Sequence, residues 1–500
     1  MKKIDLGVIV TTLIIVTISC SLAFFAARVV GEPKDINLVA KNVAITFNDT
    51  SIIANGVVSP GWNTTKTFTI TNNSKEEYKY NISIKDLLNT FVTKGYLQYK
   101  ITSTNDGYNM TEFKDIPKSS IATDTILAYS VVIPNGVTQS YTIEFKYAND
   151  ESVDQSDDMG KKLSGTLFIT EGTEDPNKTL YNQLLVDKST KLTRTDFSKV
   201  LTDNNTKTLY TSTEDSKTVY YFAGNATDNW VKFGKNASNQ DLYWRIIRTN
   251  SDGSVRLLYH GTSTTATDAV INTSTAFNTT YNNPMYVGYM YGTSNATAID
   301  RSNTNNSTIK DKIDTWYEQN MTSYTKYLST TAVYCNDRSN PAGGYNTGNS
   351  KFYYGVYTRL ITNKAPTYDC ADTNDKFTVD TSTGNGKLTY PIALMTADEV
   401  SFAGGLWATN ASTWYYYNSA KGSSTGSTWW WLLSPGHWSG GYAGVFNVSG
   451  SSDPGRLSSN FVNGTRGVRP VISLKSCVKT SGGDGSASTP YTIKETTSGC

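Results

Sequence analysis

Few side chains in this sequence have the chemistry that catalysis requires. Its 500 residues include only 2 histidines, which are His260 at the end of an apolar run and His437 in the segment Pro435–Trp438. No GxSxG, HExxH or GxxxxGK[ST] motif accompanies them. The neighbouring carboxylates Asp398 and Glu399 fit the first turn of a helix, where they face the positive end of its dipole. We therefore predict no catalytic residues and expect no enzyme.

One acidic segment could bind a metal ion. Hard cations prefer several oxygen ligands, and this segment supplies Asp369, Asp372, Asn374, Asp375 and Asp380. Calcium is one alternative for the segment. A solvated acidic loop is the other, and we favour it. No cofactor is predicted.

The cysteines after the N-terminal region form an even set: Cys335, Cys370, Cys477 and Cys500. Such a set allows three pairings, of which the nearest-neighbour scheme closes two loops of moderate length. A zinc site is the alternative, but it lacks a CxxC pair. Because disulfides persist in oxidising compartments, we expect disulfides in an extracellular protein. The sequence leaves the pairing open.

Aromatic residues alternate with Gly and Ser near the C-terminal end, first in His437–Tyr442 and then through Ser449–Phe461 to Asn463. Aromatic rings in a loop are costly to expose unless a partner covers them. Sugar rings stack on Trp and Tyr faces, and Asn side chains can bond to hydroxyls. The predicted ligand-binding residues are His437, Trp438, Tyr442, Asn460 and Asn463.

The elements that position these residues begin with an anchor. Lys2 and Lys3 precede an uncharged run from Leu6 to Ala27, which is closed by Arg28. A run of about 20 apolar residues can cross the hydrocarbon core as a helix. The preceding lysines place the N-terminus in the cytoplasm and the rest outside. We predict a stub and transmembrane signal anchor over residues 1–30, with a cleaved signal peptide as the alternative.

Charge excludes one class of partner. The sequence has 45 basic and 43 acidic residues, for a net charge of +2. Nucleic-acid binding needs a concentrated basic surface, so we expect no nucleic-acid partner. The expected partners are the membrane, through the N-terminal helix, and an extracellular ligand.

The pattern after the anchor predicts several domains. Short runs with a period of two, separated by turns, predict a β-sandwich over residues 36–172, in which Asp86–Thr93 is a brief helical insert. A polar linker over 173–214 includes a helix start near Thr179. An α+β domain over 215–476 contains a helix near Ile309–Tyr324 and a second over Ala397–Ala403, capped by Thr396 and Glu399. A Gly/Ser/Thr-rich tail, closed by a disulfide, covers 477–500.

The first domain resembles a known family. Val58–Trp62, Thr67–Ser74 and Tyr78–Ile82 are similar to the opening of camelysin/TasA-type surface domains of Gram-positive bacteria. This resemblance implies a jelly-roll-like sandwich. Some members of the family polymerise as biofilm fibres, but we carry over only the architecture.

The second domain resembles the C-type-lectin-like fold. The segments that carry the resemblance are Tyr243–Arg248, Asp252–Leu258, Ala397–Gly405, Trp431–Pro435 and Gly467–Leu474. They are similar to formylglycine-generating enzymes, phage tropism determinants and surface proteins of gut Firmicutes. The oxidase activity of the first group needs a cysteine pair that is missing here, because no cysteine lies between residues 371 and 476. The EPN and WND triplets of sugar-binding C-type lectins are also missing.

These patterns together predict a multidomain protein with an N-terminal transmembrane helix, an all-β sandwich and an α+β C-type-lectin-like domain. We expect a single-pass cell-surface adhesin or receptor that recognises a glycan or protein ligand with its extracellular bulk. A matrix or fibre-forming surface protein is the alternative. An enzyme on the same fold ranks third.

Overall fold

The computed structural model describes the backbone of residues 36–40 and 43–49, and residues 58–500 except 111, 174, 176–177, 203–205, 267–268, 294–300, 341–350, 412–427 and 451–452. Within these residues, no helix has the length and apolar character needed to span a membrane. The anchor predicted over residues 1–30 lies outside them. The chain divides into two compact units, Met1–Pro176 (unit 1) and Asn177–Cys500 (unit 2).

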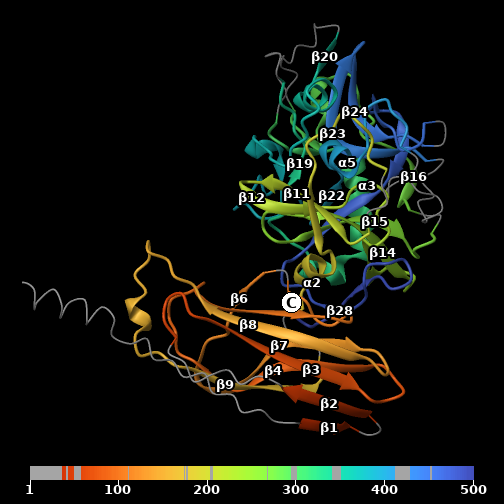
Figure 1. The fold of residues 1–500 in the computed structure, drawn as a ribbon. Coiled ribbons are helices and arrows are strands. Elements are labelled where there is room, and N and C mark those ends of the chain that lie inside the picture. Colours follow the sequence, from red (N-terminus) through yellow and green to blue (C-terminus); the bar gives the residue numbers. More distant parts are fainter. Residues whose placement is uncertain are drawn as a thin grey trace, which may run out of the picture. The chain divides into compact units, whose positions relative to one another are not determined.

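Unit 1 is built from strands that share one core (Figure 1). One sheet has the strand order β1 (Ile36–Ala40), β2 (Val43–Asp49), β3 (Asn63–Asn72), β8 (Thr138–Tyr147), β5 (Leu97–Ser103) and β6 (Lys114–Asp115). The other has the order β7 (Ser119–Ile133), β4 (Tyr78–Asn89) and β9 (Leu163–Glu171). A single 3₁₀ turn, η1 (Ser156–Asp158), precedes β9.

The period of two in the sequence explains why these strands form. Buried and exposed residues alternate along β8, because successive side chains of a strand point to opposite faces. Inward residues of both sheets meet in the core, where the hydroxyls of Tyr80 on β4 and Tyr141 on β8 lie 2.5 Å apart. Unit 1 is therefore an all-β unit. The helical insert predicted over Asp86–Thr93 is wrong, since its first half, to Asn89, ends β4 and the remainder is neither helix nor strand.

Unit 2 contains two main sheets, and the strands of the larger one come from most of the sequence of the unit. Its main path is β10 (Thr190–Thr193), β11 (Thr208–Glu214), β12 (Lys217–Tyr221), β14 (Asp241–Thr249), β13 (Trp230–Lys235), β29 (Tyr491–Ile493) and β28 (Thr480–Gly482). A branch adds β15 (Val255–Gly261), β27 (Pro470–Leu474) and β22 (Ile392–Leu394). Asn250–Gly253 form the hairpin turn between β14 and β15.

A smaller sheet of unit 2 carries the C-terminal aromatic segments. Its strands are β16 (Asn272–Ala276), β26 (Thr465–Val468), β23 (Trp430–Ser439), β24 (Tyr442–Val448) and β25 (Leu457–Phe461), and β20 (Lys351–Tyr353) pairs with β23. Two short ribbons pair β17 (Met290–Tyr291) with β18 (Asn305–Asn306) and β19 (Tyr334–Cys335) with β21 (Lys376–Phe377).

Short helices cover the sheets of unit 2. They are α2 (Leu180–Asp187), η2 (Pro284–Val287), α3 (Thr308–Asn320), η3 (Thr322–Tyr327), α4 (Gly355–Tyr357), η4 (Thr358–Thr362), η5 (Thr373–Asp375) and α5 (Ala397–Ala403). Helix α3 buries Ile309, Ile313 and Tyr317 on one face, as their helical spacing predicts. Helix α5 begins at the predicted capping box, with Thr396 and Glu399 bonded reciprocally.

Two segments belong more closely to unit 2 than the sequence indicates. Residues 173–214 were expected to form a linker, but α2, β10 and β11 lie within them, and β10 and β11 join the larger sheet. The tail over 477–500 adds β28 and β29 to the same sheet. Both corrections have one physical reason: strands as short as Thr190–Thr193 and Tyr491–Ile493 have too few residues for a period to be recognised.

Candidate functional site

The segment expected to be an aromatic loop is a hairpin of the smaller sheet. His437, Trp438 and Ser439 end β23, and Tyr442 begins β24 directly across from Ser439. Gly440 and Gly441 form the turn with φ of 58° and 82°, the positive values that a two-residue hairpin turn requires. The prediction of a loop is therefore wrong. The side chains of this segment are divided between two faces of a sheet.

Trp438 lies on the buried face. Its neighbours across the strands are Phe352 on β20 and Ala443 on β24, and only 3% of the residue is exposed. The prediction that Trp438 contacts a ligand is wrong, because the alternation of the strand turns its indole ring into the core of unit 2.

The opposite face of the sheet carries a row of aromatic side chains, which we call the aromatic belt. Its members come from the strands of the smaller sheet and from adjoining segments, and each is at least partly accessible to solvent. They are Tyr281, Tyr353, Tyr357, Trp407, His437, Tyr442 and Phe461. Figure 1 labels β23 and β24 of this sheet and β20, which pairs with β23.

One half of the belt lies on β24 and β25. The rings of Tyr281 and Tyr442 stack with centroids 4.5 Å apart and planes 8° from parallel. Phe461 lies 4.9 Å from Tyr442 and 5.6 Å from His437. Phe461 faces Gly444 across the strands, and 37% of it is exposed. These contacts form a continuous apolar surface that solvent reaches.

The other half lies on β20 and α4. Tyr353 is directly opposite His437, so the two side chains share a face. The rings of Tyr353 and Tyr357 stack with centroids 3.9 Å apart. Trp407 meets Tyr357 edge to face at 5.2 Å. The belt therefore crosses the sheet from β25 to β20.

His437 sits at the centre of the belt as a neutral ring. Its Nδ1 lies 3.1 Å from the Ser459 hydroxyl. Burial, followed by the charge of Lys351, lowers the pKa of His437 to about 4. The ring lies against Gly444, where a Cβ atom would come within 2.5 Å of the imidazole. A histidine with this pKa is a weak base, so the Ser459–His437 pair is suited to hydrogen bonding and poorly suited to general-base catalysis.

The two predicted asparagines lie at the edge of the belt. Asn460 is opposite the buried Val445, so it points away from the face of Phe461, and its Oδ1 accepts from the Phe461 amide at 2.8 Å. Asn463 is exposed in the turn after β25. Of the five predicted residues, the structure thus brings together His437 and Tyr442 around Phe461, leaves Asn463 in the turn after β25, and turns Trp438 and Asn460 to the other side.

Several belt residues were missed by sequence reasoning: Tyr281, Tyr353, Tyr357 and Trp407. They lie far from His437 in the chain and come from loops, a three-residue strand and a single helical turn. The sequence has 33 tyrosines, so a single tyrosine gave no signal. The one usable pattern was Lys351-Phe352-Tyr353, whose alternation fits an edge strand.

The other histidine is structural. His260 ends β15, is fully buried, and its ring meets Trp230 edge to face at 4.4 Å. It lies in the core and not on the belt.

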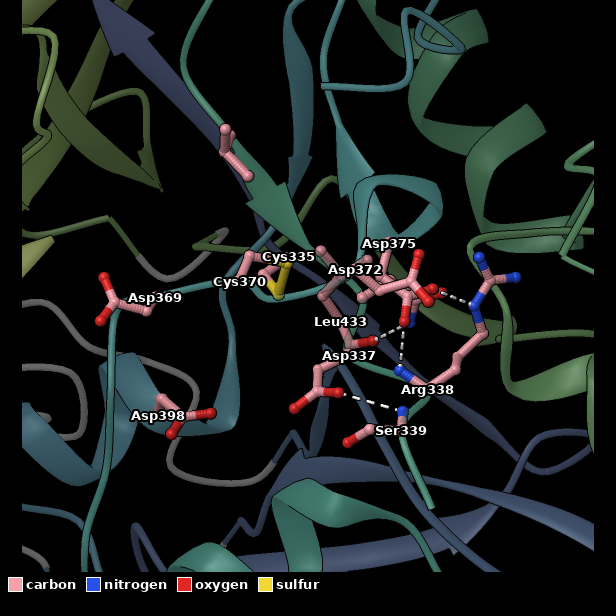
Figure 2. Close-up of a disulfide and its surroundings, with 12 residues drawn as sticks. Cys335, Asp337, Arg338, Ser339, Asp369, Cys370, Asp372, Asp375, Asp398 and Leu433 are labelled. Atoms are coloured by element: carbon pink, nitrogen blue, oxygen red, sulfur yellow. Dashed lines mark hydrogen bonds and ion pairs between the residues drawn. A yellow bond between two sulfur atoms is a disulfide. The ribbon is translucent and has the colours of Figure 1, made fainter. Parts of the chain in front are cut away.

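The cysteines pair as nearest neighbours, Cys335 with Cys370 and Cys477 with Cys500. The expectation of disulfides is confirmed. Such bonds indicate an extracellular or otherwise oxidising compartment. Figure 2 shows that carboxylates surround the first pair, among them Asp337, Asp369 and Asp372.

Arginines form ion pairs with carboxylates of the predicted acidic segment. Arg338 is fully buried and its Nε donates to Asp375 at 2.6 Å, as Figure 2 shows. Arg301 pairs with both Asp372 and Asp375. Among the side chains that the structure describes, no cluster of three or more His, Cys, Asp or Glu could hold a metal ion. The segment therefore works as a set of ion pairs that ties β19, β21 and η5 together.

A second charged network lies behind the same disulfide. Glu399 accepts from Arg248 at 3.0 Å and from Arg256 at 2.6 Å, and Arg248 also pairs with Glu214 at 2.8 Å. Glu399, Arg248 and Arg256 border a cavity of about 20 Å³, room for little more than one water molecule. The charged network holds α5 against the larger sheet.

Comparisons with known proteins are sparse. A family model described as "Domain of unknown function (DUF6273)" matches residues 314–476, which lie within unit 2. No curated protein matches the chain. One solved structure, titled "AvmM Catalyzes Macrocyclization in Alchivemycin A Biosynthesis", is 9% identical with a TM-score of 0.16, and the match covers 29% of this chain and 98% of that one. A likeness at that score carries no argument about this protein.

Proposed function

We propose that this chain is an extracellular binding protein, anchored to the cell membrane by its apolar N-terminal segment, whose unit 2 binds a glycan on the aromatic belt. The observation that carries this proposal is the belt itself. A run of contiguous aromatic side chains lies on the accessible face of a sheet, and a protein surface rarely exposes such a patch unless a partner covers it. The resemblance of unit 2 to C-type-lectin-like domains supports a binding role.

The belt is arranged for contact with flat, hydroxyl-bearing rings. Aromatic faces offer rigid contact area at small cost in conformational entropy. Ser439 and Ser459 are half-buried residues of the same strands, and the neutral imidazole of His437 can donate or accept. A sugar presents an apolar face and a rim of hydroxyls, which match these two kinds of group.

Three belt residues lie outside the packed core of unit 2. Tyr353, Tyr442 and Phe461 are absent from that core and from the partly buried side chains that border it, and they pack on Tyr357, Tyr281 and His437 of the belt instead. Tyr281, Tyr357 and Trp407 border the core. Phe461 is 37% exposed, and an accessible aromatic patch favours a contact with a ligand. Tyr353, Tyr442 and Phe461 are therefore the belt residues whose replacement should disturb the core least.

The compartment agrees with this function. Both disulfides are typical of proteins outside the cytosol. Neither histidine is placed for acid–base work, since His260 is buried and His437 is a weak base. A binding role therefore fits the described residues better than catalysis. The apolar run Leu6–Ala27 supports attachment to the membrane.

The test is a glycan array probed with the full-length chain in detergent micelles or nanodiscs. We expect binding to a subset of glycans and at least a tenfold loss, about 1.4 kcal/mol, in the variants Tyr442→Ala and Phe461→Ala. The matched control is Tyr220→Ala, since Tyr220 is also half-buried and in unit 2 but lies on β12. Trp438→Ala is unsuitable because it would open a cavity in the core.

The outcomes separate the alternatives. Full retention of binding in both belt variants would remove the belt from consideration. Filaments in negative-stain images of the purified chain, with no glycan bound, would favour the fibre-forming alternative. Thermal unfolding of each variant, measured in parallel, shows whether a loss of binding reflects the belt or the fold.

A further inference from the structure

The elements that form the belt carry positive charge and no negative charge. The belt and its supports come mainly from β20, β23, β24, β25 and α4, and Lys351 is the only residue of these elements with a charge at neutral pH. The sequence as a whole has 43 acidic residues, yet none occurs in these elements. The adjoining segments that hold Tyr281 and Trp407, residues 278–283 and 404–411, also have no charged residue. A belt of neutral rings therefore carries one cation.

Lys351 is held over the belt. It lies directly across from Ser439, and its ammonium group is 5.0 Å from the centroid of the Tyr353 ring. A cation at this distance is attracted by the face of the ring, which keeps it near the aromatic surface. In the part of the chain that the structure describes, no carboxylate forms an ion pair with Lys351. The ammonium group is exposed and has donors left for a ligand.

Two neighbouring groups report the positive potential. The hydrogen bond and charge of Lys351 lower the pKa of Tyr353. Burial lowers the pKa of His437 and Lys351 lowers it further. Both changes have the sign that a positive charge produces, because it favours the less positive form of each neighbour. The centre of the belt is therefore both apolar and electropositive.

We propose that the ligand of the aromatic belt is a glycan that carries carboxylate groups, with a sugar ring on Tyr353 and its carboxylate bound by the ammonium of Lys351. This inference rests on the proposed function and adds the class of sugar. Uronic acids and related acidic sugars combine a flat ring with a carboxylate at its edge. The belt has the complementary groups: an aromatic ring face for the face of the sugar, and a cation at its edge for the carboxylate.

Because Lys351 is accessible to solvent, an ion pair with it should change the affinity for the ligand only modestly. An ion pair between accessible groups contributes about 0.2–1 kcal/mol, so one carboxylate on Lys351 should change affinity about 1.4- to fivefold. A polymer with a carboxylate on each sugar can rebind along the belt, and the preference should weaken with added salt because exposed charges are screened.

The experiment compares two probes of the same length: oligogalacturonate, and its carboxyl-reduced form in which each carboxylate has become a hydroxymethyl group. Binding to the full-length chain is measured by calorimetry at pH 7. We expect the carboxylated probe to bind about 1.4- to fivefold more tightly. Lys351→Gln should abolish that preference and leave binding of the reduced probe unchanged. Lys387→Gln, which removes an exposed lysine on another part of unit 2, should change neither.

The results distinguish this inference from the proposed function. Equal affinity for the two probes, or a preference that survives Lys351→Gln, would overturn the acidic-sugar assignment while the belt remains a glycan site. A Lys351-dependent preference for dextran sulfate equal to that for oligogalacturonate would replace carboxylate by any anion and overturn it too. Failure of every glycan on the array to bind would instead reject the proposed function.

Discussion

The buried network around Glu399 allows a prediction whose magnitude can be worked from contacts. Only 1% of Glu399 is exposed. Its Oε1 accepts from Arg248 at 3.0 Å and from Arg256 at 2.6 Å. Its Oε2 accepts from the Thr396 amide at 2.9 Å, which completes the capping box of α5. One carboxylate thus joins two strands of the larger sheet to the start of a helix.

The substitution Glu399→Gln keeps the shape and removes the charge. In either orientation of the new amide, its NH₂ group faces a donor, because all three partners are donors. Arg248 would keep its pair with Glu214, but Arg256 would lose its ion pair with Glu399. Removal of one partner from a buried ion pair costs about 3–5 kcal/mol. We expect the free energy of unfolding of unit 2 to fall by about that amount.

The assay is urea unfolding of the full-length chain followed by tryptophan fluorescence. All tryptophans except Trp62 lie in unit 2, so the signal reports mainly on this unit. The control is Asp453→Asn, which removes an accessible pair with Arg456 at 3.0 Å and should cost less than about 1 kcal/mol. A loss for Glu399→Gln as small as that of the control would refute the reasoning.

The pH dependence gives an independent check. Burial raises the pKa of Glu399, but Arg256 and Arg248 outweigh it, so the pKa lies below its usual range. A carboxyl group with a lowered folded-state pKa stabilises the fold above its unfolded-state pKa of about 4.3 and loses that contribution as pH falls through the folded-state value. The difference between wild type and Glu399→Gln should therefore be full at pH 7 and shrink in acid below about pH 4.

Three further predictions concern the belt and the disulfides. Gly444→Ala should displace the His437 ring, weaken glycan binding and cost about 1–3 kcal/mol of stability, measured by the array and by urea unfolding. The His437 ring protons should titrate in NMR spectra with a midpoint near 4; since the pKa is lowered, the unfolded chain takes up the proton first, and stability should fall as pH drops from about 6.5. The double variant Cys335→Ser/Cys370→Ser opens a loop with a sequence separation of 35 and should cost about 3–5 kcal/mol in urea unfolding, whereas an unchanged midpoint would contradict it.

Local signals in the sequence predicted the parts of the fold that local physics determines. The capping box of Thr396 and Glu399 located α5 to the residue, because both bonds lie within one turn. The spacing of Ile309, Ile313 and Tyr317 located α3. The nearest-neighbour pairing of cysteines was among the possibilities, but only the packed structure selects it, because sequence spacing does not bring Cys335 to Cys370.

The aromatic belt was harder to predict because tertiary pairing creates it. Gly440-Gly441 has the composition of a tight turn, and this would have divided His437–Tyr442 into two strands with alternate faces. As a single loop, the segment would instead place Trp438 beside Tyr442. The partners Tyr281, Tyr353 and Trp407 reach the belt through strand pairing and loop contacts that no sequence period records.

Charged side chains are distributed differently in the interior of unit 2 and on the belt. Arginines and carboxylates gather in the interior, where Arg248, Arg256 and Arg338 neutralise buried acids. Their hydrogen bonds are satisfied there, so they stabilise the fold and leave little charge for a ligand. The belt has the opposite arrangement, with accessible rings and one cation that no described carboxylate neutralises. The Tyr353 ring holds that ammonium group 5.0 Å from its centroid, and the proposed ligand, with an apolar face and a negative edge, would complement both groups.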